Sequence, residues 1–298
     1  MTGRPPYRVM GIVNVTPDSF SDGGEFLDAD AAIAHARTLA LEGADILDVG
    51  GESTRPGAEP VSADEELRRV LPVLEGIATA DLEAQVSIDT SKASVARAAI
   101  AAGAQIVNDV SALRADPAMV ELIADSGVHC CLMHMLGEPR TMQRAGGPQY
   151  KDVVDEVKAF LEERLGFAVR AGVGEERIML DPGIGFGKTV AHNLELLDRL
   201  DELTVLGRPL VVGTSRKSFL ARVLAGEGGP ASAEGPARPD APENRLPGTI
   251  ATNVLALERG ASIFRVHEVA PVGDALAVAA ATLHGRWTAR RRATTPRS

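Results

Sequence analysis

Polar and charged side chains stand directly after almost every short apolar segment of this chain. They are Asn14, Glu52, Ser53, Thr54, Arg55, Asp89, Asn108, Asp109, His134, Asp181, Ser215, Arg216, Lys217, Arg265 and His267. A carboxylate can accept two parallel N–H bonds from an amino-pyrimidinone edge, and an amide offers both a donor and an acceptor. Asp89, Asn108 and Asp181 therefore suit a polar heterocycle such as a pterin or guanine. Lys217 could add a bond to a ring carbonyl or nitrogen.

A second group of residues has the chemistry of an anion site. Arg55, Arg265 and His267 can donate hydrogen bonds to phosphate oxygens, and Asn14 carries an amide oxygen able to ligate magnesium. A bound diphosphate with its metal ion requires such a set. Neither group contains a serine or cysteine convincingly paired with a base, so we do not expect nucleophilic catalysis by the protein.

Each of these residues also has a plainer structural explanation. Asp89 and Asp181 could cap helices or form turns, and Asn108 could be a satisfied core amide. His134 could equally be a packed histidine, and Asp48, one step deeper in its segment, is expected to be a structural hydrogen-bonding group. Surface charges would not fall so regularly, which favours a common site. We expect the remaining histidines to be structural: His35, His129, His192 and His284.

The segment GIGFGKT is similar to a phosphate-binding loop but fails its pattern. The motif G-x-x-x-x-G-K-[ST] needs glycine at the position of Pro182. We expect these glycines to let the loop curl over a flat ligand, with Phe186 against the ligand's face. No spacing of cysteine or histidine predicts a zinc site, and the adjacent Cys130 and Cys131 cannot form an ordinary disulfide framework.

The elements that must position these residues follow a regular alternation. Eight apolar segments alternate with longer alanine- and leucine-rich segments of helical period. The predicted strands are residues 7–14, 44–50, 85–90, 105–110, 128–134, 177–183, 209–215 and 261–267. Ser62 and Glu65 have the spacing of a capping box, and Asp116, Pro117 and Gly127 mark the start and end of another helix. Eight such units predict a single-domain α/β fold, the (β/α)8 TIM barrel, whose ligands bind on the loops after the strands. A doubly wound open sheet is the alternative, which the absence of a G-x-G-x-x-G fingerprint disfavours.

Composition narrows the class of function. A net charge of −10 and an aromatic content of 3% disfavour nucleic-acid binding. Because no apolar run reaches the roughly 18 residues of a membrane span and the first residues lack a signal peptide, we expect a cytoplasmic enzyme that does not bind membranes. We expect residues 1–7 to be an N-terminal extension, 8–285 the barrel, 226–247 a Gly/Pro/Ala-rich insertion and 286–298 a basic, disordered tail.

Eight motifs resemble, in order, the landmarks of the dihydropteroate synthase family, the folate-pathway enzymes that sulfonamides target. They are NVTPDSFSDGG, DVGGESTRPGA, SIDT, NDVS, LMH, DPGIGFGKT, GTSRKSF and RVHE, and the resemblance spans residues 8–285. It implies a (β/α) barrel, a homodimer and Mg2+ as cofactor. The implied reaction condenses 6-hydroxymethyl-7,8-dihydropterin diphosphate with p-aminobenzoate to give 7,8-dihydropteroate and pyrophosphate.

The resemblance also implies a role for each site residue. The pterin residues are Asp89, Asn108, Met133, Asp181, Phe186 and Lys217. The p-aminobenzoate residues, where a sulfonamide would also bind, are Phe20, Thr54, Pro56, Ser215, Arg216 and Lys217. The diphosphate residues are Asn14, which is also the metal ligand, Asp22, Arg55, Arg265 and His267. Catalysis would fall to Asp89, Asp181, Lys217, Arg265 and His267. Glu268 replaces the aspartate usual in the family, and the insertion before Leu246 is longer than usual; neither departure lies among these contact residues.

The implied chemistry is a dissociative substitution. The aryl amine is neutral at pH 7, so breaking the C–O bond to diphosphate is the difficult step, and carboxylates could stabilise the methylene cation that develops. Because water would capture that cation, we expect the loop after the first strand, with Phe20, to close the site together with the GESTRPGA loop. Two rival functions remain: a methyltetrahydrofolate corrinoid methyltransferase, which needs no diphosphate site, and a catalytically inactive pterin-binding paralogue.

Overall fold

The structure, a computed structural model, describes residues 6–16, 25–53, 58–137, 148–226 and 245–285. Its strands are β1 (Arg8–Asn14), β2 (Ile46–Gly50), β3 (Gln85–Asp89), β4 (Ile106–Asp109), β5 (His129–Met133), β6 (Ile178–Asp181), β7 (Val211–Val212) and β8 (Ile263–Val266). Paired strands are parallel, in the order β6-β5-β4-β3-β2-β1-β8-β7. A parallel bridge between Leu180 and Leu210 joins the two ends of this sheet. The sheet is therefore the predicted (β/α)8 barrel and not an open sheet.

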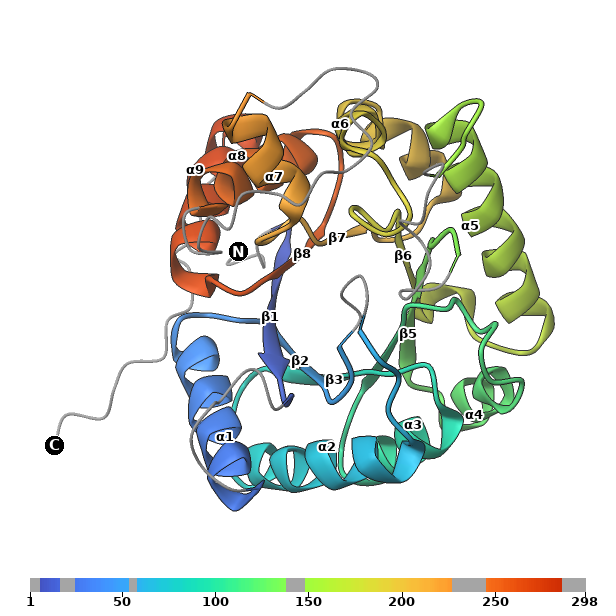
Figure 1. The fold of residues 1–298 in the computed structure, drawn as a ribbon, viewed down its shortest axis with the longest axis vertical. Helices are drawn as coiled ribbons and strands as arrows, with labels where there is room; N and C mark the ends of the chain where they lie inside the picture. The colour runs from blue at the N-terminus through green and yellow to red at the C-terminus, as the bar shows by residue number, and fades with distance from the viewer. Residues whose placement is uncertain (1–5, 17–24, 54–57, 138–147, 227–244, 286–298) are drawn as a thin grey trace, which may run out of the picture.

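Helices enclose the strands in a ring (Figure 1). The described α-helices are α1 (Glu25–Leu41), α2 (Ala63–Ala78), α3 (Ala93–Ala101), α4 (Ala118–Ser126), α5 (Val153–Arg170), α6 (Val190–Asp198), α7 (Ser218–Leu224), α8 (Leu246–Glu258) and α9 (Val269–His284). Two 3-10 helices accompany them, η2 (Glu175–Arg177) and η3 (Leu200–Leu206). None of these helices is long and apolar enough to cross a membrane. Helix α8 starts at Leu246, so it includes the last two residues, 246 and 247, of the predicted insertion.

Local signals explain where two of these helices begin. Ser62 caps α2, and its side chain accepts a hydrogen bond from the Glu65 N–H at 3.2 Å, as the sequence spacing predicts. The start of α4 differs by one residue from the prediction, because Pro117 occupies the cap position. Asp116 still caps this helix, since its Oδ1 accepts from the Ala118 N–H at 3.0 Å.

The barrel interior is built in layers. An apolar layer fills the part of the interior nearer the N-terminal ends of the strands. It is formed by Met10, Ile46, Ile106, Cys131, Met179, Val211 and Ile263. Successive residues of a strand face opposite sides of a sheet, so the residue two positions later also faces the interior. That residue is Asp48 in β2, Asn108 in β4, Met133 in β5, Asp181 in β6 and Arg265 in β8. Strand periodicity therefore places the polar site directly above a layer of closely packed apolar side chains.

Candidate active site

Four polar side chains meet at the centre of the barrel mouth. Asp48, which is fully buried, accepts hydrogen bonds on Oδ2 from Arg265 Nε at 2.7 Å and from Asn108 Nδ2 at 3.1 Å. Arg265 Nη2 also donates to Asp89 Oδ2 at 2.8 Å. Asp89 and Asn108 are register partners on the adjacent strands β3 and β4. Arg265 thus connects the residues predicted for the pterin with those predicted separately for the diphosphate.

Asp48 and Asp89 both bond the single guanidinium of Arg265, and these charges affect the pKa of Asp89. Burial raises the pKa of Asp89 to about 7; Arg265 opposes this shift, and Asp48 adds to it. Burial acts to lower the pKa of Arg265, but Asp48 and Asp89 outweigh it and the pKa is raised. Arg265 Nη1 makes no hydrogen bond to any described residue. This N–H group is therefore available to an anion while the other nitrogens hold the carboxylates.

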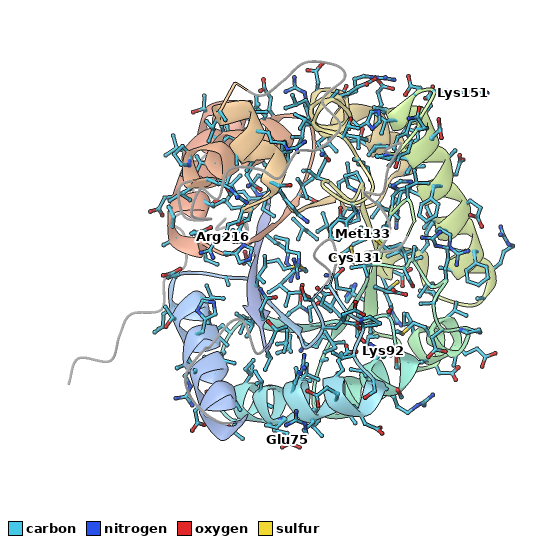
Figure 2. The ribbon with its side chains drawn as sticks, in the orientation of Figure 1. Glu75, Lys92, Cys131, Met133, Lys151 and Arg216 are labelled. Carbon is cyan, nitrogen blue, oxygen red and sulfur yellow. The ribbon has the colours of Figure 1, made fainter. Side chains whose placement is uncertain are left out.

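A second part of the mouth combines a cation, an aromatic ring and a carboxylate. The Lys217 ammonium lies 3.8 Å from the centroid of the Phe186 ring. Phe186 packs against Met133, which Figure 2 shows on the β5 side of the central opening. Asp181, the register partner of Met133, accepts a 2.6 Å hydrogen bond from the Gly183 N–H. Burial raises the pKa of Asp181 to about 6, although this hydrogen bond and the charge of Lys217 oppose the shift.

Ser215, Arg216, His267 and Glu268 form a third group at the ends of β7 and β8. Ser215 Oγ lies 2.9 Å from His267 Nδ1 and donates to Glu268 Oε2 at 3.3 Å. Glu268 Oε1 accepts from Arg216 Nε at 2.6 Å. Glu268 is not one of the predicted contact residues, but its carboxylate holds two of them, Ser215 and Arg216. Its contact is with the serine hydroxyl, whereas a catalytic triad places the carboxylate on the imidazole.

The backbone of Arg216 adopts a left-handed conformation, with φ of 59°. A non-glycine residue in this region stores about 1–3 kcal/mol of strain, which its surroundings must offset. Arg245 Nη1 donates to the Arg216 carbonyl at 2.7 Å, and Thr249 Oγ1 accepts from the Arg216 N–H at 3.4 Å. The strained residue lies between Ser215 and Lys217, two of the predicted site residues.

Some predicted residues serve the scaffold. Asp109 accepts from the backbone N–H groups of Ser111 and Leu113, each at 2.8 Å, so it forms a turn. Glu52 pairs with Lys92, which also bonds the buried Glu66. His134 is buried, and its Nδ1 lies 2.9 Å from Lys188 Nζ. It takes no part in the hydrogen bonds that Asp48 and Arg265 make. Five predicted residues lie outside the described part of the chain: Phe20, Asp22, Thr54, Arg55 and Pro56.

Asn14 ends β1 beside Gly50 of β2 and is half-buried. No group of three His, Cys, Asp or Glu residues able to hold a metal ion occurs in the described residues. Mg2+ usually keeps several waters and uses one or two protein oxygens together with substrate phosphates. The donor set here, one amide oxygen at the mouth, fits an ion held chiefly by a diphosphate and not a closed protein cage.

Sequence reasoning missed two residues of this region, Glu268 and Lys188. Asp48 was expected to be a structural hydrogen-bonding group, and its bonds to Arg265 and Asn108 agree with that expectation. The inward position of Asp48 could be predicted from the sequence, because Asp48 lies two positions after Ile46 in β2 and both side chains must face the interior. Glu268 follows His267 directly and could have been included for that reason. Nothing in the sequence indicated a role for Lys188 beyond its place in the segment GIGFGKT, which fails the pattern of a phosphate-binding loop.

Comparisons with known proteins agree with this geometry. The model of the family described as "Pterin binding enzyme" matches residues 10–267, so the barrel and its polar mouth define a pterin-binding enzyme. The dihydropteroate synthase of Escherichia coli K12 is 45% identical over 279 residues, covering 94% of this chain and 93% of the relative. That of Mycobacterium leprae is 47% identical and covers 94% of each chain. The chain belongs to the dihydropteroate synthase family.

Solved structures give the same result in three dimensions. The Xanthomonas albilineans dihydropteroate synthase with 4-aminobenzoic acid superposes with a TM-score of 0.82 at 47% identity, covering 93% of each chain. The same enzyme in complex with 7,8-dihydropteroate has a TM-score of 0.80 at 45% identity and covers 95% of each chain. The Yersinia pestis enzyme with a sulfonamide drug has a TM-score of 0.83 at 42% identity, covering 93% of this chain and 94% of its own.

Proposed function

We propose that this chain condenses 6-hydroxymethyl-7,8-dihydropterin diphosphate with p-aminobenzoate, releasing pyrophosphate and 7,8-dihydropteroate, with the residue roles set out below. The observation that carries the proposal is the position of Arg265, which bonds the buried Asp48 and Asp89 at 2.7 and 2.8 Å at the barrel mouth. It places a cation for a diphosphate beside a carboxylate for a pterin. The ligands named for the Xanthomonas relatives, 4-aminobenzoic acid and 7,8-dihydropteroate, support the same substrates.

The pterin would lie over the apolar layer of the barrel. Asp89, Asn108 and Asp181 supply the acceptors and donors that its amino-pyrimidinone edge needs, and Met133 and Phe186 supply apolar contact. Lys217, held over Phe186, can donate to a ring carbonyl or nitrogen.

Breaking the C–O bond separates charge between the pterin and the diphosphate. In the ionised form, Asp89 and Asp181 stabilise the cation that develops on the pterin methylene. Arg265 Nη1 and His267 bind the departing diphosphate on the other side. One well-placed group of this kind typically lowers a barrier by about 3–4 kcal/mol. When bound, a magnesium ion held by Asn14 and the diphosphate would supply further neutralisation of the leaving group.

The neutral aryl amine of p-aminobenzoate then attacks the methylene carbon, and its proton leaves to solvent or to the diphosphate. Ser215, Arg216 and Lys217 form the described side of its site, with Phe20, Thr54 and Pro56 assigned to the other side by motif position. Arg216 lies on the side of the opening opposite Met133 (Figure 2). A sulfonamide would occupy the same place, in keeping with the drug complex of the Yersinia relative.

A pyrophosphate-release assay tests the proposed reaction. Release should require both substrates, depend on Mg2+, and fall when a sulfonamide competes with p-aminobenzoate. An inactive paralogue would bind the pterin diphosphate without release. A corrinoid methyltransferase would instead bind methyltetrahydrofolate and show no release. Either of those two results would reject the proposal.

We also propose that the chain forms a homodimer through α8 and α9. Three large apolar side chains on these helices are exposed, Leu255 at 44%, Val278 at 69% and Leu283 at 45%. Val278 and Leu283 line a groove between the two helices, together with Val254 and Ala275. Contiguous exposed apolar surface of this kind commonly marks a protein–protein interface.

A further inference from the structure

Lys188 is buried at the end of the glycine-rich loop between β6 and α6. Its side chain is 2% exposed, and its Nζ donates to the carbonyls of Gly183 at 2.9 Å and Phe186 at 3.1 Å. The same nitrogen lies 2.9 Å from His134 Nδ1 and 3.5 Å from the His134 carbonyl. One amino group therefore ties both ends of the turn 183–186 to the end of β5.

The loop follows β5 so closely that only glycine fits at two of its positions. Gly183 has φ of +68°, and a Cβ atom there would lie 1.9 Å from the His134 carbonyl oxygen. Gly187 has φ of +60°, and its Cβ would lie 2.4 Å from the Leu136 oxygen. Glycines allow this close approach, but they also make the unrestrained loop flexible. The contacts of Lys188 restrain it, because two of the carbonyls it binds, those of Gly183 and Phe186, belong to the turn, whereas His134 belongs to the end of β5.

His134 completes the environment of this amino group. Its ring packs edge-on against Phe160, with centroids 4.9 Å apart, and tilted against Tyr150 at 6.1 Å. Burial, together with the charge of Lys188, lowers the pKa of His134 to about 2. The imidazole therefore stays neutral, and its Nδ1 can accept a hydrogen bond from the Lys188 ammonium. His134, left undecided by the sequence, is a packed histidine with a specific partner.

We propose that Lys188 is a positioning residue of the pterin site: by binding the Gly183 and Phe186 carbonyls against His134, it holds the Phe186 ring beneath Lys217. The inference rests on the proposed assignment of the pterin to Phe186 and Lys217. Lys188 does not touch the substrate in this arrangement. It acts through the loop, whose Phe186 ring lies 3.8 Å from the Lys217 ammonium.

The variant Lys188→Met tests this role, because it keeps most of the unbranched side chain and removes the donor. Calorimetric binding of pterin diphosphate should weaken about 10- to 100-fold, the range for a small displacement of positioning groups. At saturating pterin diphosphate, the KM for p-aminobenzoate should change less than the affinity for pterin diphosphate, because Ser215 and Arg216 are held by Glu268 and only Lys217 is shared with this loop. Lys158→Met, on the outer helix α5, is the matched control and should bind like the wild type. A folded Lys188→Met protein that binds pterin diphosphate as the wild type does would overturn the inference.

A second pair of variants keeps the test decisive if Lys188→Met fails to fold. His134→Gln retains an acceptor for Lys188, whereas His134→Leu removes it. We expect weaker pterin diphosphate binding in His134→Leu than in His134→Gln, and equal binding in two folded variants would refute the role. Asp181→Ala separates the two proposals. Normal binding in Asp181→Ala rejects the pterin site itself, while lost binding there with normal binding in Lys188→Met rejects only the inference.

Discussion

Asp48 offers the sharpest test of how the centre of the site is built. It is fully buried, and its Oδ2 accepts from Arg265 Nε at 2.7 Å and Asn108 Nδ2 at 3.1 Å. Its Oδ1 has no hydrogen-bond partner among the described residues. The change Asp48→Asn preserves the shape and lets the amide oxygen take the place of Oδ2. Only the negative charge is lost.

The size of the effect follows from the two hydrogen bonds. A hydrogen bond to a charged group contributes about 1.5–3 kcal/mol, against about 0.5–1.5 kcal/mol for a neutral pair. Losing the charge from both bonds should therefore lower the free energy of unfolding by about 2 kcal/mol, with Asp89 still paired to Arg265. In a protein of 298 residues, that corresponds to a fall in Tm of about 3 °C. Asp48→Ala removes the acceptor as well and should cost about 3–5 kcal/mol.

Urea denaturation and steady-state kinetics measure the two consequences together. Besides the stability loss, the KM for pterin diphosphate should rise about tenfold, because Arg265 loses its anchor, a cost of about 1.4 kcal/mol. Asp48 raises the pKa of Asp89, so the acid limb of the pH–activity profile should move to lower pH in Asp48→Asn. The exposed Asp125→Asn on α4 is the control and should stay within about 0.5 kcal/mol of the wild type. A similarly small change in Asp48→Asn, with an unmoved acid limb, would refute this account of Arg265.

Five further predictions follow from the site and from the exposed surface of α8 and α9. Lys217→Ala should lower kcat about 100- to 1000-fold in the pyrophosphate-release assay, and near-normal turnover would contradict its assigned role. Burial raises the pKa of Asp89 to about 7 and of Asp181 to about 6, so kcat/KM should fall as pH drops through this range; a flat profile down to pH 5 would reject their ionised roles. Because the folded chain binds these protons more tightly than the unfolded chain, their contribution to stability should decrease as pH rises from about 4 to 7, which urea denaturation at several pH values would measure. Phe20→Ala should raise the KM for p-aminobenzoate and leave the affinity for pterin diphosphate nearly intact, whereas equal losses in both would reject a role in the second substrate's site. Val278→Asp should convert a dimer to a monomer in light scattering, and an unchanged molecular mass would exclude the α8–α9 interface.

The sequence by itself determined the architecture and the positions from which the site is built. Alternating apolar and helical segments predict all eight strands, because a parallel sheet needs buried strands joined by covering helices. Because alternate residues of a strand face the same side, a polar residue two positions after an inward-facing apolar residue also faces the interior. Ile106 and Asn108 show this in β4. The ordered motifs predict the family for the same reason: each lies at a strand end, where the barrel collects its ligands.

Only the tertiary structure decided which of these side chains pair with one another. Arg265 meets Asp48 across 217 positions of the chain, a contact that exists because closure of the barrel makes β8 a neighbour of β1 and brings β2 within reach. Lys188 finds His134 because the loop after β6 folds back over the end of β5. A side chain's residue type states what it can bind, but its partner depends on strand register and loop path, which short stretches of sequence do not encode.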